Sequence, residues 1–200
     1  DASDWFENIE RLGGSLLAEE KVSFTRELAQ LSARNPSGEF TTWPLVETRQ
    51  ENGVCSVVIS PAPNANQSTL DHAAQIARTV SEGLGVTGVL AVEMFETTDG
   101  RLLINELAMR PHNSGHFSIE GSVTSQFEQH LRAVANLPLG DTSAIAPAAI
   151  LADHWTRTGR NDRAEICRWA YLAGLADIDA LDLDGVEPMT HPTPIAPSAA

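Results

Sequence analysis

The strongest constraint on how this chain folds is an Asp-Gly pair between two apolar stretches. Asp99 and Gly100 separate GVLAVEMFETT (88–98) from RLLINELA (101–108). Asp-Gly is typical of a two-residue type I′ turn, because both central residues of that turn need a positive φ. We therefore predict a β-hairpin over residues 88–108.

A two-residue turn at this position would also set the register of the hairpin. Cross-strand partners would have numbers that sum to 199, which places Phe95 opposite Ile104. The same register places Glu93 opposite Glu106. Directly opposed like charges destabilise a sheet, by roughly 3 kcal/mol at about 5 Å and an effective dielectric near 20. A shift of the turn by one residue would make the glutamates diagonal and weaken this inference.

The glutamates lie among apolar side chains, so we expect both faces of the hairpin to be covered. Two facing carboxylates in such a place need a cation, or one of them must hold a proton. Carboxylate oxygens suit Mg²⁺ or Mn²⁺, and Asn105 could add an amide oxygen. The alternative is a solvated end of the sheet with two ordinary glutamates.

A polar loop, MRPHNSGH, follows the second strand without a gap. Its Arg110 carries a planar guanidinium that suits phosphate or carboxylate. The other polar side chains are those of His112, Asn113, Ser114 and His116. The sequence favours either a binding loop or a turn that is stabilised by its own hydrogen bonds.

Before the hairpin, the pattern predicts mainly extended structure. Residues 5–14 have the pattern of the last turns of a helix, with Trp5, Ile9 and Leu12 on one stripe. Extended segments are predicted over residues 15–34, 41–50 and 54–60, separated by turns.

Helical periodicity appears on both sides of the hairpin. STLDHAAQIARTVSEGLG (68–85) opens with a Ser-x-x-Asp capping box. Residues 122–140 predict a second helix with Phe127, Leu131 and Val134 as its stripe. This order of elements indicates an α+β fold with helices on one side of a mostly antiparallel sheet.

Charge and composition limit the partners. The chain has 13 basic and 27 acidic residues, and its formal charge is −14. This argues against a nucleic-acid binder, because nucleic-acid affinity comes largely from Lys and Arg. No apolar run approaches a membrane span, and two cysteines suggest no disulfide framework. We expect a cytoplasmic protein that binds neither nucleic acid nor membrane.

Several segments together resemble the ATP-grasp carboxylases, in particular the 5-(carboxyamino)imidazole ribonucleotide synthases of purine biosynthesis. The segments are LLAEEKVSFTREL (16–28), WPLVETRQENGVCSVVISPAP (43–63), GVLAVEMFETTDGRLLINELAMRPHNSGH (88–116) and GSVTSQFEQHLRAVANLPLGDTS (121–143). The resemblance covers about residues 15–150. It implies an ATP-grasp C-terminal lobe, ATP and Mg²⁺ or Mn²⁺ as cofactors, and a homodimer.

The resemblance also implies a reaction and a role for each matching residue. ATP would phosphorylate bicarbonate to carboxyphosphate, which would carboxylate 5-aminoimidazole ribonucleotide. Glu93 and Glu106 would hold the metal with Asn105 beside them, and Glu27 would bind the ribose. Residues placed at the adenine or near the nucleotide are Glu19, Glu20, Lys21, Val22 and Gln50. Residues placed at the substrates are Arg110, His112, Asn113, Ser114 and His116, of which Arg110 and His116 are the candidate catalytic residues.

The sequence departs from the family pattern at both ends. The phosphate-gripping lysines of the family have no counterpart, since Lys21 is the sole lysine. We therefore predict a partial ATP-grasp domain over residues 1–150. A divergent segment over 151–200 is predicted to contain a helix (163–180) and a disordered Pro/Ala-rich tail. Its LDLDGVEPMTHP stretch (181–192) weakly resembles the C subunit of tRNA-dependent amidotransferase. Two alternatives remain, another ATP-grasp ligase and a non-catalytic interaction module that keeps the fold.

Overall fold

One antiparallel sheet organises the chain. The computed structural model describes residues 6, 9, 11–14, 17–51, 54–147, 149–153 and 167–171. The strands are β1 (Phe24–Arg34), β2 (Phe40–Thr42), β3 (Val46–Glu51), β4 (Val54–Ser60), β5 (Gly88–Thr97), β6 (Leu102–Ala108), β7 (Ala149–Asp153) and β8 (Cys167–Tyr171). They lie in the order β6-β5-β1-β3-β4-β7-β8, and β2 pairs with β1. Every pairing among these strands is antiparallel, as predicted.

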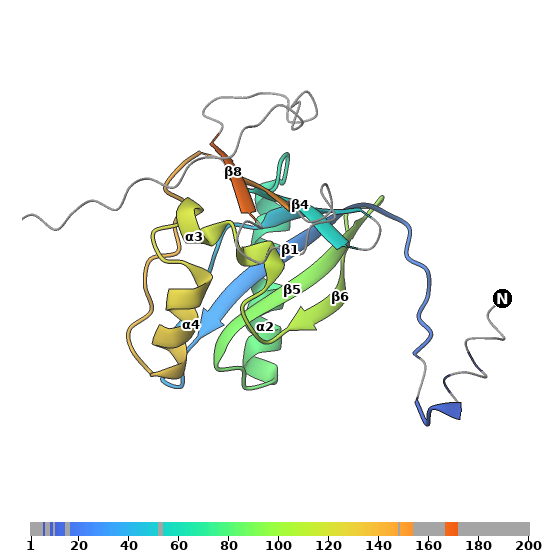
Figure 1. The fold of residues 1–200 in the computed structure, drawn as a ribbon, viewed down its shortest axis with the longest axis horizontal. Helices are drawn as coiled ribbons and strands as arrows, with labels where there is room; N and C mark the ends of the chain where they lie inside the picture. Colours follow the sequence, from blue (N-terminus) through green and yellow to red (C-terminus); the bar gives the residue numbers. More distant parts are fainter. Residues whose placement is uncertain are drawn as a thin grey trace, which may run out of the picture.

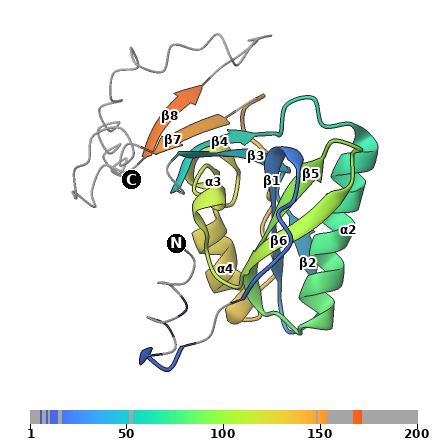
Figure 2. The same cartoon turned by 90° about the vertical axis from the view of Figure 1, so that its right-hand side faces the viewer.

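Helices cover both faces of this sheet. Helix α2 (Gln67–Gly83) lies on one face, and Figures 1 and 2 show the opposite face covered by α3 (Ser118–Gly121) and α4 (Gln126–Val134). A short 3-10 helix, η1 (Asn113–Gly115), precedes α3. The prediction that helices cover one side only was wrong. Central strands that are apolar on both faces need cover on both.

The two faces of β1 and β5 form two separate cores. Leu28 of β1 and Met94 of β5 pack with Ala73 and Ala77 of α2. The intervening strand residues point the other way, and a second core contains Ala29, Leu31, Val89, Ala91 and Phe117. Because successive side chains alternate between faces, every position of these strands has a defined side. This alternation determines which residues can share a site.

Helix α2 begins two residues earlier than the capping box predicted. Asn66 is the N-cap, and its Oδ1 accepts a hydrogen bond from the Thr69 amide at 2.9 Å. Ser68 lies inside the first turn and is exposed. Residues 61–65 connect the end of β4 to Asn66, whose side chain satisfies an otherwise free N–H group in the first turn of α2.

Replacement of these two residues separates the observed cap from the predicted one. Asn66→Ala should lower the free energy of unfolding by about 1 kcal/mol, because it removes the cap hydrogen bond. Ser68→Ala should change it by less than about 0.5 kcal/mol. Urea unfolding followed by circular dichroism measures both, and equal effects would contradict the assignment of Asn66.

Helix α4 buries the opposite face from the one predicted. Its predicted apolar stripe is solvent-exposed, with Leu131 66% accessible. The buried side consists of Gln126, Gln129 and Ala133. The two glutamines are buried because they form hydrogen bonds to neighbouring loops. The periodicity of apolar residues in the sequence gives no sign of such bonds.

The terminal predictions are tested only in part. Residues 6, 9 and 11 are helical, and Gly13 ends this piece with a φ of 68°. Within the range predicted as a helix, residues 167–171 instead form β8, which pairs with β7. The remainder of 163–180, Trp5 and the Pro/Ala-rich tail lie outside the described residues. No helix in the described part of the chain is long and apolar enough to cross a membrane.

Candidate functional site

The loop of the β5–β6 hairpin begins one residue earlier than predicted, at Thr98. The Thr97 amide donates to the Arg101 carbonyl at 2.9 Å, and the Gly100 amide donates to the Thr97 carbonyl at 2.9 Å. The loop therefore has three residues, with Gly100 at a φ of 79°. This is the arrangement of a type I turn followed by a left-handed residue. The two-residue turn was wrong, and Phe95 pairs with Leu103 rather than with Ile104.

A β-bulge restores the pairing of the two glutamates. Met94 pairs with Ile104, yet Glu93 pairs with Glu106, so Asn105 is the extra residue on β6. The bulge adds one residue to β6 and compensates for the shifted turn. The prediction that Glu93 faces Glu106 is thus confirmed, although the turn it was based on differs.

Glu93 lies in an unfavourable electrostatic position. Glu27 pairs with Phe95 and Ala29 with Glu93, which places Glu27 on the same face as Glu93, two residues further along the strands. The pKa of Glu93 is raised, first by burial and then by the charges of Glu106 and Glu27, while Arg110 opposes the rise. The Glu93 side chain is only 17% exposed.

The face around this pair is not covered as expected. Asn105 and Glu106 are exposed, and Leu103, which pairs with Phe95 on this face, is only half-buried. Phe117, at the start of α3, packs on this face in one core with Ala29 and Leu31 of β1. The carboxylates consequently open to solvent on the β6 side, where a ligand could reach them.

The donor set fits a hard divalent cation that is shared with phosphate. Carboxylate oxygens from Glu93 and Glu106 and the amide oxygen of Asn105 are the ligand types of Mg²⁺. Among the described residues, no group of three or more His, Cys, Asp or Glu side chains could hold a metal ion without help. A cation at Glu93 and Glu106 would therefore need further oxygen atoms from a bound phosphate group, as Mg²⁺ commonly does.

The raised pKa of Glu93 has a testable consequence for stability. A carboxyl group whose pKa is higher in the folded protein stabilises the fold when protonated, and this contribution is lost as the pH rises through the folded pKa. Glu93→Gln should therefore raise the free energy of unfolding at pH 7, by about 0.5–1 kcal/mol. The gain should shrink toward zero as the pH falls below the ordinary value of 4.5.

Urea unfolding between pH 4 and 8 measures this difference. Glu82→Gln is a matched control, since Glu82 is exposed on α2 and pairs with Arg78 at 3.2 Å. Its effect should stay within about 0.5 kcal/mol at every pH. A Glu93→Gln protein that is less stable than wild type at pH 7 would contradict the electrostatic account.

The loop after β6 brings His112 to the acidic pair. Its Nδ1 lies 3.6 Å from Glu93 Oε1 and 2.9 Å from Ser114 Oγ. The pKa of His112 is lowered, mainly by burial and next by Arg110, whereas Glu106 raises it and His116 lowers it further. At pH 7 the ring is therefore neutral. Arg110 is exposed and brings a positive charge to the loop.

The tip of the loop is packed tightly against the sheet. Asn113 Nδ2 donates to the Cys55 carbonyl on β4 at 3.4 Å. Gly115 is buried, and a Cβ placed there would lie 2.0 Å from Leu31 Cδ2 and 2.4 Å from Gln126 Oε1. Only glycine fits this close approach of the loop to β1.

A methyl group at position 115 should loosen the loop. Gly115→Ala should lower the free energy of unfolding by about 1–3 kcal/mol through overpacking. Gly83→Ala is the matched control, since Gly83 lies in α2 and a Cβ there would have no neighbouring atom within 4 Å. It should be neutral or stabilising by up to about 1 kcal/mol. Equal effects in urea unfolding would refute the close packing.

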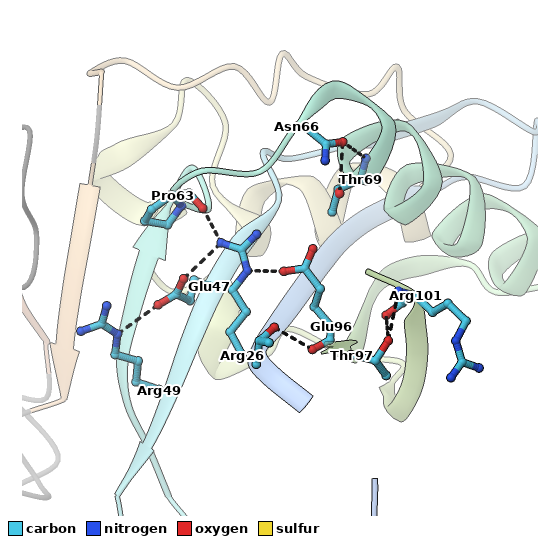
Figure 3. Close-up of polar contacts among 10 residues, drawn as sticks. Arg26, Glu47, Arg49, Pro63, Asn66, Thr69, Glu96, Thr97 and Arg101 are labelled. Carbon is cyan, nitrogen blue, oxygen red and sulfur yellow. Dashed lines mark hydrogen bonds and ion pairs between the residues drawn. The ribbon is translucent and has the colours of Figure 1, made fainter. Parts of the chain in front are cut away.

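An ion-pair network lies behind the site, on the α2 face of the sheet. Figure 3 shows Arg26 of β1 between Glu47 of β3 and Glu96 of β5, with a further hydrogen bond to the Pro63 carbonyl. Arg49 adds a second pair to Glu47 at 3.0 Å. Since Arg26 precedes Glu27 on β1, this network holds the strand that presents Glu27 on the other face.

The structure unites only some of the predicted site residues. Glu93, Glu106, His112 and Ser114 lie together, with Glu27 along the same face. His116 influences the pKa of His112, and its ring stacks on Phe127 at 5.7 Å. Residues 19–21 are exposed in irregular chain before β1, Val22 is half-buried, and Gln50 is exposed on β3. The structure does not bring these five residues to the acidic pair through any side-chain hydrogen bond or ion pair of the described residues.

Two features of the site were missed from the sequence. Phe24 and Phe95 stack with their centroids 4.4 Å apart, and Phe95 lies on the same face as Glu93. Gln126 is fully buried and bonds the main chain of His112. The aromatic residues at both strand ends could have indicated the stack, whereas a glutamine on a helix gives no such signal.

Facing carboxylates beside an Arg- and His-containing loop form a site suited to a phosphate-bound cation. Residues 1–127 match the ATP-grasp domain family. The chain belongs to the ATP-grasp family, and its α+β fold agrees with that of the solved members.

The similar proteins carry the name of one particular enzyme within the ATP-grasp family. The chain is 52% identical over 153 residues to N5-carboxyaminoimidazole ribonucleotide synthase of Mycobacterium tuberculosis, an alignment that spans 76% of this chain and 36% of the relative. The crystal structure of the synthetase from Thermus thermophilus is similar, with a TM-score of 0.69, 41% identity, and 76% of this chain and 42% of that chain aligned. The synthase from Aspergillus clavatus, solved with ADP and 5-aminoimidazole ribonucleotide, has a TM-score of 0.64 at 35% identity, and the alignment spans 68% of this chain and 36% of that one. The chain thus spans well under half the length of these relatives.

Proposed function

We propose that this chain forms the metal-binding lobe of an ATP-dependent carboxylase that acts on 5-aminoimidazole ribonucleotide. The observation that carries the proposal is the facing pair of Glu93 and Glu106, in which burial and neighbouring charge raise the pKa of Glu93. A bound cation would remove that electrostatic cost. The names of the relatives identify the reaction, and one of them was solved with the ribonucleotide.

The proposed reaction has two steps. A bicarbonate oxygen attacks the γ-phosphorus of ATP, ADP leaves, and carboxyphosphate forms. The exocyclic amine of the ribonucleotide then attacks the carboxyl carbon, phosphate leaves, and the amine loses a proton. Bound Mg²⁺ would supply charge neutralisation for the phosphate oxygens.

The residues of this chain would position the reactants. Glu93 and Glu106 hold the cation, with Asn105 supplying an amide oxygen from the bulge. Glu27 binds the ribose hydroxyls, and residues 19–22 receive the adenine edge, with Gln50 near the nucleotide. The stacked pair of Phe24 and Phe95 supplies an apolar surface on the same face as the carboxylates.

The polar loop would bind the transferred group and the ribonucleotide. Arg110 carries a positive charge at neutral pH, whereas the lowered pKa of His112 keeps that ring uncharged. Arg110 can therefore stabilise the negative charge that develops on the transferred group. His112, Asn113, Ser114 and His116 supply hydrogen-bonding groups toward bicarbonate and the ribonucleotide.

Calorimetric titration with ATP, with and without Mg²⁺, tests the metal site. We expect ATP binding that requires Mg²⁺ and weakens at least about tenfold in Glu93→Gln and in Glu106→Gln, because each variant removes a charged ligand. Glu82→Gln is the control, an exposed glutamate on α2 outside the site.

Two results would contradict the proposal. One is ATP binding by the wild type that is the same with and without Mg²⁺. The other is a folded Glu93→Gln or Glu106→Gln protein with the wild-type Mg²⁺ dependence. Thermal unfolding of each variant establishes that the protein titrated is folded.

A further inference from the structure

Helix α4 carries two glutamines that are completely buried, Gln126 and Gln129. Each one bonds both main-chain groups of a single residue in a neighbouring loop. Gln129 bonds Gly140, accepting from its amide at 2.8 Å and donating to its carbonyl at 2.8 Å. Gln126 makes the same pair of bonds to His112, which belongs to the candidate site.

The contacts of Gln126 fix the loop where it passes Glu93. Its Oε1 accepts from the His112 amide at 2.9 Å, and its Nε2 donates to the His112 carbonyl at 2.8 Å. The side chain of the same histidine lies 3.6 Å from Glu93. Because both of its main-chain groups are bonded to one side-chain amide, the Cα–Cβ direction of His112 is fixed. The contact of its Nδ1 with Ser114 Oγ at 2.9 Å then restricts rotation of the ring.

The loop in turn holds Gln126 in place through Ser118. The main-chain N–H of Gln126 donates to Ser118 Oγ at 2.8 Å, and Ser118 Oγ donates to the Gly115 carbonyl at 2.6 Å. Ser118 is fully buried, and Gly115 is buried beside it. A closed set of buried and partly buried hydrogen bonds thus joins both ends of the segment 112–115 to the start of α4.

We propose that Gln126 is a positioning residue for the candidate site, which fixes the main chain of His112 and thereby holds its imidazole against Glu93. The importance of this geometry for ribonucleotide binding rests on the proposed function. The positioning itself does not.

The amide group is chemically suited to this position. A glutamine supplies one donor and one acceptor at the spacing of a peptide group, so it satisfies a buried N–H and a buried C=O together. An ionised glutamate could accept from the amide but not donate to the carbonyl. A methionine of similar length would leave the His112 N–H without its partner. It would also remove one of the two hydrogen bonds to the His112 carbonyl, which accepts from the Gly115 amide at 3.0 Å as well.

Gln129 provides the matched control, because it is equally buried, lies on the same helix and makes the same type of contact. We would measure hydrogen exchange of the full chain by mass spectrometry in wild type, Gln126→Met and Gln129→Met. In Gln126→Met, exchange in the peptide 110–116 should rise at least tenfold while 137–142 is unchanged. Gln129→Met should show the reverse.

Gln126→Glu provides a second variant that preserves size and one hydrogen bond. It should raise exchange in 110–116 by less than Gln126→Met does, and it keeps the test available if the methionine variant does not fold. Equal exchange increases in both peptides for both methionine variants would overturn the positioning role, since they would indicate general loosening. No increase in 110–116 for a folded Gln126 variant would also overturn it.

Affinity for 5-aminoimidazole ribonucleotide, measured calorimetrically with Mg²⁺ and ATP present, then tests the functional consequence. Gln126→Met should bind at least tenfold more weakly than wild type, and Gln129→Met within twofold of it. Wild-type affinity in a Gln126→Met protein with a loosened loop would overturn that consequence. Absence of binding by the wild type would count against the proposed function, whereas the exchange pattern would still decide the positioning of His112.

Discussion

The site depends on one unfavourable interaction, the opposition of Glu93 and Glu106 across two strands. Like charges facing each other destabilise a sheet, and burial on the Glu93 side increases the cost. Surrounding structure maintains the pairing nonetheless. The bulge at Asn105 holds the register, and the ion pairs of Arg26 hold β1 and β5 together from the opposite face. Carboxylates whose pKa is perturbed by burial and a neighbouring charge cluster at functional sites.

A second dependence runs from α4 to the loop after β6. Helices usually turn an apolar stripe inward, yet α4 buries glutamines and exposes Phe127, Leu131 and Val134. The buried amides bond the main-chain groups of His112 and Gly140, which both lie in irregular segments. The loop is therefore stabilised by a polar interior, which gives it a defined conformation that an apolar contact alone would not specify.

Much of the fold followed from the sequence because its determinants are local. The Asp-Gly pair and the alternating apolar residues predicted the hairpin, and the change of periodicity predicted α2. The wrong predictions concern features that depend on contacts between separate segments of the chain. The orientation of α4 follows from bonds to residues 11 to 14 positions away, and β8 forms because β7 offers a partner edge. Of the candidate site, the facing glutamates and the polar loop were predictable, whereas the roles of Gln126, Ser118 and the Phe24–Phe95 stack were not.

The sequence by itself determined that two glutamates occupy one hairpin and that a loop with one arginine and two histidines follows them, since both are facts of spacing. It did not determine how they come to pair, because a two-residue turn without a bulge and a three-residue turn with one give the same opposition of Glu93 and Glu106. Only the tertiary structure decided which of these occurs, which side of the pair is open to solvent, and that His112 approaches Glu93. These outcomes depend on packing between segments that are far apart in the chain, where no local pattern records the contact.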